Sequence, residues 1–191
     1  MGKFNFIKTE IEGLYEIEPT VFGDDRGYFM ETYNDEFKFL LKHIDGSVAE
    51  FVQDNESKSR KGVLRGLHMQ FSHPQAKLVR VTNGEVWDVA VDVRKDSPTF
   101  GKWHGVLLSG ENKKQFFVPE GFLHGFVVLS DTATFVYKCT RLYEPTDEYG
   151  VAWDDVDIGI NWPTTEVQLS EKDKRNHSLA ELKKRIAEVL V

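Results

Sequence analysis

Two of the six histidines, His68 and His124, stand where side-chain chemistry is favoured. His68 lies in the segment 62–70 and His124 in the segment 118–126, and both segments combine β-like apolar residues with glycine. Glycine inside a strand marks a point where another backbone or a ligand approaches closely. A single histidine is more often structural than functional, so the argument depends on the residues that surround each one.

A metal site is the first chemistry to weigh. β-barrel enzymes often bind iron, zinc or manganese through two or three histidines and a carboxylate. Two such ligands on one strand are spaced His-x-His, because alternate residues face the same side. The residue two positions after His68 is Gln70, a poor ligand, and no glutamate follows closely. The sequence therefore predicts no metal site.

Acid–base chemistry at a carbon atom is the second possibility. It needs a base, a group that orients the base, a donor near the developing enolate and an acid on the opposite face. His68 suits the base, and Lys77 with Tyr137 or Tyr143 suits the donor and the acid. Several carboxylates could orient His68, and the pattern does not choose among them. Either tyrosine could equally be a core ring with a satisfied hydroxyl group.

The elements that would position these residues are short strands separated by turn residues. In the clearest case the runs 77–82 and 85–93 flank Asn83-Gly84. Asn-Gly suits a type I′ turn, so the pattern predicts a hairpin. Alternation along its second strand predicts one face with Trp87, Val89, Val91 and Val93, and an opposite face with Val86, Asp88, Ala90 and Asp92.

Similar patterns predict strands over 14–22, 28–32, 48–53, 105–109, 115–118, 122–129 and 133–141. This number and spacing is typical of a sandwich or barrel, so we expect one all-β domain over residues 1–191. Asn34 is expected to cap a short helix. A C-terminal helix is predicted over about 178–190, because Ser178 and Glu181 form a capping box.

The composition limits the partners and the compartment. The net charge is −7 with no basic block, which argues against nucleic-acid binding. No apolar run is long enough to cross a membrane or to form a signal peptide. The one cysteine, Cys139, permits no intramolecular disulfide and is expected to be buried. A cytoplasmic protein is therefore expected.

Seven blocks of the chain together resemble one known family. They occur in order and with similar spacing at 23–27, 51–55, 63–68, 77–80, 97–101, 119–126 and 169–173. Over about residues 6–173 the chain resembles the dTDP-4-dehydrorhamnose 3,5-epimerases. The C-terminal helix lies outside the resemblance.

The resemblance implies a cupin-type jelly roll, a homodimer, a nucleotide-sugar substrate and no metal or redox cofactor. It implies that His68 is the base, that Asp173 orients it and that Lys77 lies near the 4-keto oxygen. Tyr137 is implied as the acid on the opposite face of the sugar ring. The remaining residues that it places in the substrate site are Arg26, Glu31, Gln53, Asn55, Arg65, His124, Glu148 and Lys172. Tyr143 is added to them as a candidate substrate-binding residue.

The implied reaction is chemically coherent. The C4 ketone of dTDP-4-dehydro-6-deoxy-D-glucose acidifies the hydrogens at C3 and C5, and inversion at both centres gives dTDP-4-dehydro-L-rhamnose, in dTDP-L-rhamnose biosynthesis. Arg26 and Arg65 suit the diphosphate, because guanidinium groups bind phosphate oxygens well. An epimerase at C3 or C5 alone, a ketoisomerase of a related nucleotide-linked keto-sugar and a non-catalytic sugar-binding protein are the alternatives. The intact His68, Lys77 and Tyr137 favour epimerisation without fixing how many centres invert.

Strand parity raises one difficulty for this site. In a regular strand Arg65 and His68 point to opposite faces. Either Gly66 marks a bulge that re-aims the chain, or Arg65 reaches the ligand from the end of the strand.

Overall fold

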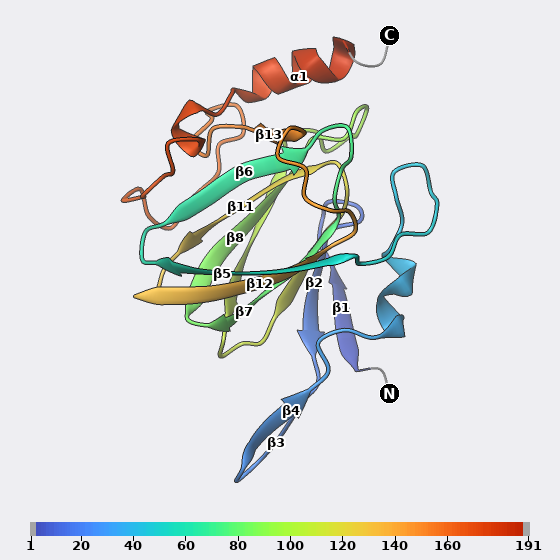
Figure 1. Ribbon diagram of the computed structural model, residues 1–191, viewed down its shortest axis with the longest axis vertical. Coiled ribbons are helices and arrows are strands. Elements are labelled where there is room, and N and C mark those ends of the chain that lie inside the picture. The colour runs from blue at the N-terminus through green and yellow to red at the C-terminus, as the bar shows by residue number, and fades with distance from the viewer. Residues whose placement is uncertain (1–2, 189–191) are drawn as a thin grey trace.

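Two antiparallel sheets face each other in the computed structural model, which describes residues 3–188 (Figure 1). The six-stranded sheet has the order β1 (Phe4–Lys8), β2 (Tyr15–Pro19), β10 (Gln115–Val118), β7 (Lys77–Asn83), β12 (Thr132–Cys139) and β5 (Gln53–Arg60). The five-stranded sheet has the order β13 (Glu148–Gly150), β6 (Leu64–Gln70), β11 (Phe122–Val128), β8 (Glu85–Asp92) and β9 (Trp103–Ser109). The expected all-β jelly roll is confirmed.

The remaining elements lie outside the two sheets. β3 (Val21–Asp24) and β4 (Gly27–Met30) form a separate hairpin that projects from the body (Figure 1). Two short 3₁₀ helices, η1 (Asp35–Phe39) and η2 (Asp173–Arg175), and the helix α1 (Leu179–Glu188) complete the described chain. No helix within residues 3–188 is long and apolar enough to span a membrane.

Apolar side chains fill the space between the sheets and also cover part of each outer face. Val79, Phe116 and Phe135 of the six-stranded sheet pack with Val86 and Ala90 of β8 in the interior. The other face of β8 packs with α1, in a cluster that contains Val89, Val91, Leu179 and Leu182. The predicted two faces of β8 are therefore confirmed. Phe37 of η1 belongs to a third cluster, which lies on the six-stranded sheet.

The predicted hairpin at Asn83-Gly84 is wrong. β7 and β8 do not pair: β7 lies between β10 and β12, whereas β8 lies between β11 and β9 in the other sheet. A type I′ turn needs positive φ at both central residues, but only Gly84 has it, at 75°. The Asn-Gly pair therefore turns the chain from one sheet into the other, a use that the dipeptide pattern does not distinguish from a hairpin.

Other element predictions have mixed outcomes. The strand predicted over 48–53 is wrong, because residues 49–52 have no regular structure and β5 begins at Gln53. Ala49 and Phe51 of this segment pack in the cluster that contains Phe37 of η1, whereas Val48 and Val52 are exposed. The predicted Asn34 cap is confirmed, since its side chain accepts a hydrogen bond from Glu36 N. α1 is confirmed over Leu179–Glu188, and the predicted extension to 190 lies outside the described residues.

A bulge at Gly66 resolves the parity difficulty in β6. Arg65 and His68 pair with Phe126 and His124 of β11, so three steps along β6 oppose two along β11. Gly66 has a φ of 121°, and a Cβ there would lie 2.7 Å from Gly125 Cα and from the His124 carbonyl oxygen. The extra residue turns both Arg65 and His68 to the same side.

Replacing Gly66 with alanine is therefore expected to destabilise the protein strongly. The new Cβ meets backbone atoms that cannot move aside, and the positive φ adds strain, for a loss of about 3 kcal/mol or more in the free energy of unfolding. Gly46→Ala is the matched control, because Gly46 also has positive φ but open space around it. Its loss should stay near 1–2 kcal/mol, roughly the cost of strain alone. Equal losses in denaturant titrations of the two variants would contradict this account of Gly66.

Candidate active site

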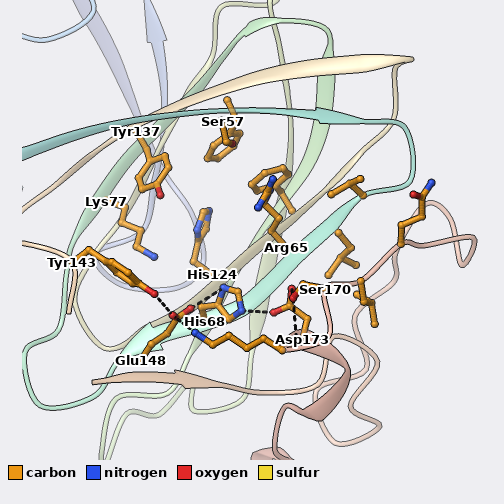
Figure 2. Close-up of a pocket in the computed structure, with 17 residues that line it drawn as sticks. Ser57, Arg65, His68, Lys77, His124, Tyr137, Tyr143, Glu148, Ser170 and Asp173 are labelled. Carbon is orange, nitrogen blue, oxygen red and sulfur yellow. Dashed lines mark hydrogen bonds and ion pairs between the residues drawn. The ribbon is translucent and has the colours of Figure 1, made fainter. Parts of the chain in front are cut away.

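A cavity of about 600 Å³ opens between the two sheets. Figure 2 shows side chains from both sheets pointing into it. Its lining includes residues of β6, β7, β11 and β12, together with the chain segments before and after β13. They are Ser57, Val63, Leu64, Arg65, His68, Lys77, His124, Phe126, Phe135, Tyr137, Tyr143, Glu148, Gln168, Leu169, Ser170, Lys172 and Asp173.

His68 is held on one side by a buried carboxylate. Its Nε2 lies 2.5 Å from Oδ1 of Asp173, the first residue of η2. Ser170 Oγ donates to the other carboxylate oxygen at 2.8 Å. Burial alone would raise the pKa of Asp173, but the hydrogen bonds from His68, Ser170 and Asn176 outweigh it and lower this pKa. Asp173 is therefore a charged acceptor that fixes the orientation of the imidazole ring.

A second carboxylate lies on the other side of the ring. Glu148 Oε1 is 3.4 Å from His68 Nδ1, and Oε2 accepts a 2.6 Å hydrogen bond from the Tyr143 hydroxyl group. Lys172 forms an ion pair with the same oxygen. Burial opposes ionisation of Glu148, but the bonds from Lys172 and Tyr143 lower its pKa. The hydrogen bond to this carboxylate raises the pKa of Tyr143 to about 12.

Lys77 and Tyr137 reach the cavity from β7 and β12 of the six-stranded sheet (Figure 2). Shielding of the Lys77 ammonium group from water lowers its pKa, although Cys139, Glu148 and Asp88 act in the opposite direction. Burial raises the pKa of Tyr137, so its hydroxyl group keeps its proton at neutral pH. Both groups are therefore shielded from bulk solvent and face the cavity.

The other predicted site residues fall into two groups. Arg65, His124, Tyr143, Glu148 and Lys172 line the same cavity. Gln53 and Asn55 line an adjoining cavity of about 190 Å³, which His68, Lys77 and Tyr137 also line. Eleven of the thirteen predicted site residues are therefore brought together within one chain.

Arg26 and Glu31 are the two residues that this chain does not bring to the cavity. Arg26 lies at the turn of the β3–β4 hairpin, with a side chain that is 90% exposed and bonded to Asp24. Glu31 follows β4 and accepts a hydrogen bond from Asn34 at 2.7 Å. Neither residue lines the cavity that His68 faces.

Two polar residues of the site were missed by the sequence analysis. Ser170 supports Asp173, and its position three residues earlier is a spacing that suits such a hydrogen bond. Asp88 is fully buried on β8 and binds His124 Nε2 at 2.9 Å. The available signal for Asp88 was an acidic residue on the strand face that also carries Val86 and Ala90.

The potential metal ligands occupy other places. The side-chain amide of Gln70 is buried, donates to the His73 carbonyl oxygen and accepts from Glu144 N, so it braces the loops around it. Among residues 3–188, one group of three close ligand-type side chains occurs, formed by His73, Glu144 and Asp147. None of these three lines the cavity that contains His68.

Comparison with known proteins gives a consistent result. Residues 8–181 match the model of a family described as dTDP-4-dehydrorhamnose 3,5-epimerase. The chain is 54% identical over 184 residues to the enzyme of that name from Methanothermobacter thermautotrophicus, covering 95% of this chain and 97% of the relative. It is 53% identical to that from Escherichia coli K12, over 93% and 96%. A crystal structure of dTDP-6-deoxy-D-glucose-3,5-epimerase from Legionella pneumophila, in complex with dTDP-4-keto-L-rhamnose, superposes with a TM-score of 0.89 at 50% identity, over 96% of each chain.

The hydrogen bond between Tyr143 and Glu148 is expected to control the titration of that tyrosine. Glu148→Gln keeps an acceptor but removes the negative charge, so the pKa of Tyr143 should fall from about 12 toward its ordinary value. An NMR titration of the tyrosine ring carbons measures this pKa. Glu144→Gln is the control, because it removes a nearby carboxylate that does not bind Tyr143. A pKa that stays near 12 without the Glu148 charge would rule the explanation out.

Proposed function

The chain belongs to the dTDP-4-dehydrorhamnose 3,5-epimerase family, and from this membership we propose how its cavity performs the reaction. It is an isomerase that converts dTDP-4-dehydro-6-deoxy-D-glucose to dTDP-4-dehydro-L-rhamnose, in dTDP-L-rhamnose biosynthesis. One observation carries the mechanism: His68 and Tyr137 stand on opposite sheets, with the cavity between them. A sugar ring bound there would have a base on one face and an acid on the other.

His68 acts as the base. Donation of the Nε2 hydrogen to Asp173 leaves the lone pair of Nδ1 free to accept a proton. The hydrogens at C3 and C5 are acidic because both carbons adjoin the C4 ketone. Asp173 also stabilises the imidazolium that forms, so the base is both oriented and strengthened. Glu148, 3.4 Å from Nδ1, adds negative charge on the side where the proton arrives.

Lys77 and Tyr137 complete the inversion. The negative charge of the enolate develops on the C4 oxygen, and a nearby ammonium group stabilises it best in a site with little water. The lowered pKa of Lys77 indicates such an environment. Tyr137 keeps its proton until the carbanion forms, then delivers it from the face opposite His68, which inverts the carbon. The same groups can treat C3 and C5 in turn, because the two carbons flank the same ketone.

The phosphate end of the substrate requires a partner subunit in this proposal. Arg65 lines the cavity, but the second arginine implied by the resemblance, Arg26, lies in the turn between β3 and β4. This hairpin projects from the body (Figure 1). Phe22, Tyr28 and Phe29 of this hairpin are 48–64% exposed, which is unusual for aromatic residues in a monomer. We propose a homodimer in which each hairpin carries Arg26 and Glu31 to the partner's cavity.

Three further expectations belong to the same proposal. The reaction changes no oxidation state and uses only protein acids and bases, so no metal or redox cofactor is required. The nucleotide sugar is the partner, and neither nucleic acid nor a membrane takes part. A cytoplasmic location stays a prediction that depends on the single cysteine, Cys139, which is buried and free.

Deuterium exchange in D₂O is expected to separate the base from the acid. His68→Ala should abolish both inversion and exchange at C3 and C5, because no carbanion forms. Tyr137→Phe should keep exchange at one or both carbons, since His68 can return a deuteron to the same face, while inversion slows by more than about ten-fold. Asp173→Asn should fall between, because it disturbs His68 without removing it.

NMR time courses of the sugar nucleotide measure both processes. His73→Ala is the control, because His73 is exposed and outside the cavity, and it should behave as wild type. Loss of exchange in Tyr137→Phe as complete as in His68→Ala would refute the division of roles and make Tyr143 the next candidate acid. Deuterium at a single carbon in the wild-type product would indicate a single-centre epimerase instead.

Mixing two inactive variants should restore activity if Arg26 serves the partner's cavity. His68→Ala and Arg26→Ala are each expected to be impaired alone. In a mixed dimer, the Arg26→Ala subunit keeps His68 and receives Arg26 from its partner, so one of two sites is intact. With random exchange of subunits in an equal mixture, activity should approach about a quarter of wild type.

The matched control pairs His68→Ala with Arg65→Ala. Arg65 lines the cavity of its own chain, so no mixed site contains both groups and activity should not recover. Recovery in the Arg65 mixture, or none in the Arg26 mixture despite confirmed exchange of subunits, would contradict the proposed dimer.

A further inference from the structure

A second histidine–aspartate pair lies beside the first. His124 of β11 is the direct cross-strand partner of His68 on β6. Directly opposed residues of antiparallel strands have Cβ atoms only about 5 Å apart. His124 Nε2 lies 2.9 and 3.1 Å from the two carboxylate oxygens of Asp88, much as His68 Nε2 meets Asp173. Two neighbouring imidazoles of one cavity are therefore each held by a buried carboxylate.

Asp88 is a fully buried carboxylate on the face of β8 that meets the other sheet. Its exposed fraction is 0%, and burial raises its pKa although the neighbouring His124 opposes that shift. Charged side chains are rarely fully buried, and a buried ion pair is seldom more stabilising than apolar residues of similar volume. The adjacent positions on this face, Val86 and Ala90, are apolar. Packing between the sheets alone would favour an apolar residue at position 88.

Asp92 shows what a structural aspartate looks like on the same face of β8. It is also 0% exposed, but it binds Arg94, Ser97 and Thr99, which belong to the loop that follows β8. Burial opposes its ionisation, yet these hydrogen bonds lower its pKa. Asp92 thus has three side-chain partners that anchor a loop. Asp88 hydrogen-bonds one side chain within residues 3–188, and that side chain faces the cavity.

We propose that Asp88 is a positioning residue for the reaction, which holds the His124 ring against the same sugar ring that His68 deprotonates. The inference rests on the proposed function of the cavity. Figure 2 shows His124 among Lys77, Arg65 and His68. With Nε2 engaged by Asp88, the ring cannot turn about its side-chain bonds, and Nδ1 is the nitrogen left for the substrate. Asp88 acts through His124 and does not touch the substrate itself.

The consequence for catalysis concerns geometry rather than binding strength. A polar group that contacts the reacting end of a sugar must be correctly placed as charge develops at the C4 oxygen. A freely rotating His124 would lose that placement while the nucleotide, the larger part of the ligand, stays bound. Loss of Asp88 should therefore lower kcat and leave KM little changed.

The test compares kinetic constants of Asp88→Asn and Asp88→Leu with those of wild type. Both substitutions approximate the shape of aspartate without its charge, and both should lower kcat by roughly 10- to 100-fold. This is less than the ~10⁴-fold loss known for the orienting aspartate of a general base, because His124 does not take the proton. Added to His124→Ala, either substitution should cause no further loss, since the group through which Asp88 acts is gone.

Asp92→Asn is the matched control, with a lower melting temperature and an unchanged kcat. The inference is overturned if a folded Asp88 variant keeps the wild-type kcat. It is also overturned if the Asp88 substitution lowers kcat by the same factor in the wild-type protein and in His124→Ala. Two Asp88 variants guard against one that fails to fold, with folding checked by circular dichroism. Exchange of the C3 and C5 hydrogens with solvent, measured for His68→Ala, separates the two proposals. If His68→Ala still exchanges these hydrogens, the proposed function is refuted. If it does not, and Asp88→Asn keeps the wild-type kcat, this inference alone is refuted.

Discussion

The close approach of two glycine-containing backbones fixes the geometry on which the cavity depends. At Gly66 and Gly125 neither strand has room for a Cβ atom, since each would meet backbone atoms of the other at 2.7 Å. The bulge that this contact permits shifts the register of β6 by one residue. His68 and His124 thereby become direct partners, and Arg65 turns to the same side. A regular ladder would have sent Arg65 or His68 to the opposite face of the sheet.

In the proposed mechanism each of the two sheets supplies part of the chemistry. The five-stranded sheet supplies His68 and His124, and the six-stranded sheet supplies Lys77 and Tyr137. Because the sheets are joined through a packed core, the distance between base and acid is set by the rigid body of the protein rather than by mobile loops. An inverting reaction benefits from this arrangement, since its base and acid must stand on opposite faces of one carbon. Carboxylates of the cavity also stabilise its cationic groups: Glu148 forms an ion pair with Lys172, and Glu148 and Asp88 favour the charged form of Lys77.

Local patterns predicted strands β7 to β12 but neither β6 as a strand nor the pairing of the strands. The alternation of β8 was right because one face meets the other sheet and the other face meets α1, so both faces are constrained. Asn83-Gly84 misled because a dipeptide reports a turn and not which strands it joins. Most of β5 escaped prediction because it is an edge strand of polar residues, from Gln53 to Arg60. His68 was recognisable from its glycine-containing segment, whereas the pairing with Asp173, 105 positions away, came only from the resemblance. Asp88 was visible only as an anomaly on an apolar face, because a sequence does not show what a buried carboxylate binds.

Inversion at two centres places a demand on the cavity beyond its two faces. In the proposed mechanism His68 holds a proton and Tyr137 lacks one after the first inversion, so both must be reset before the neighbouring carbon can react. The side chain of His68 is 24% exposed, whereas that of Asp173 is 5% exposed. The base can therefore exchange its proton with water, while the carboxylate that orients it stays shielded. The raised pKa of Tyr137 also favours the reset, because a buried phenolate readily takes up a proton to become neutral again. A cavity in which water reaches His68 while Asp173 stays buried thus suits a reaction that repeats the same proton transfer at the two carbons beside the ketone.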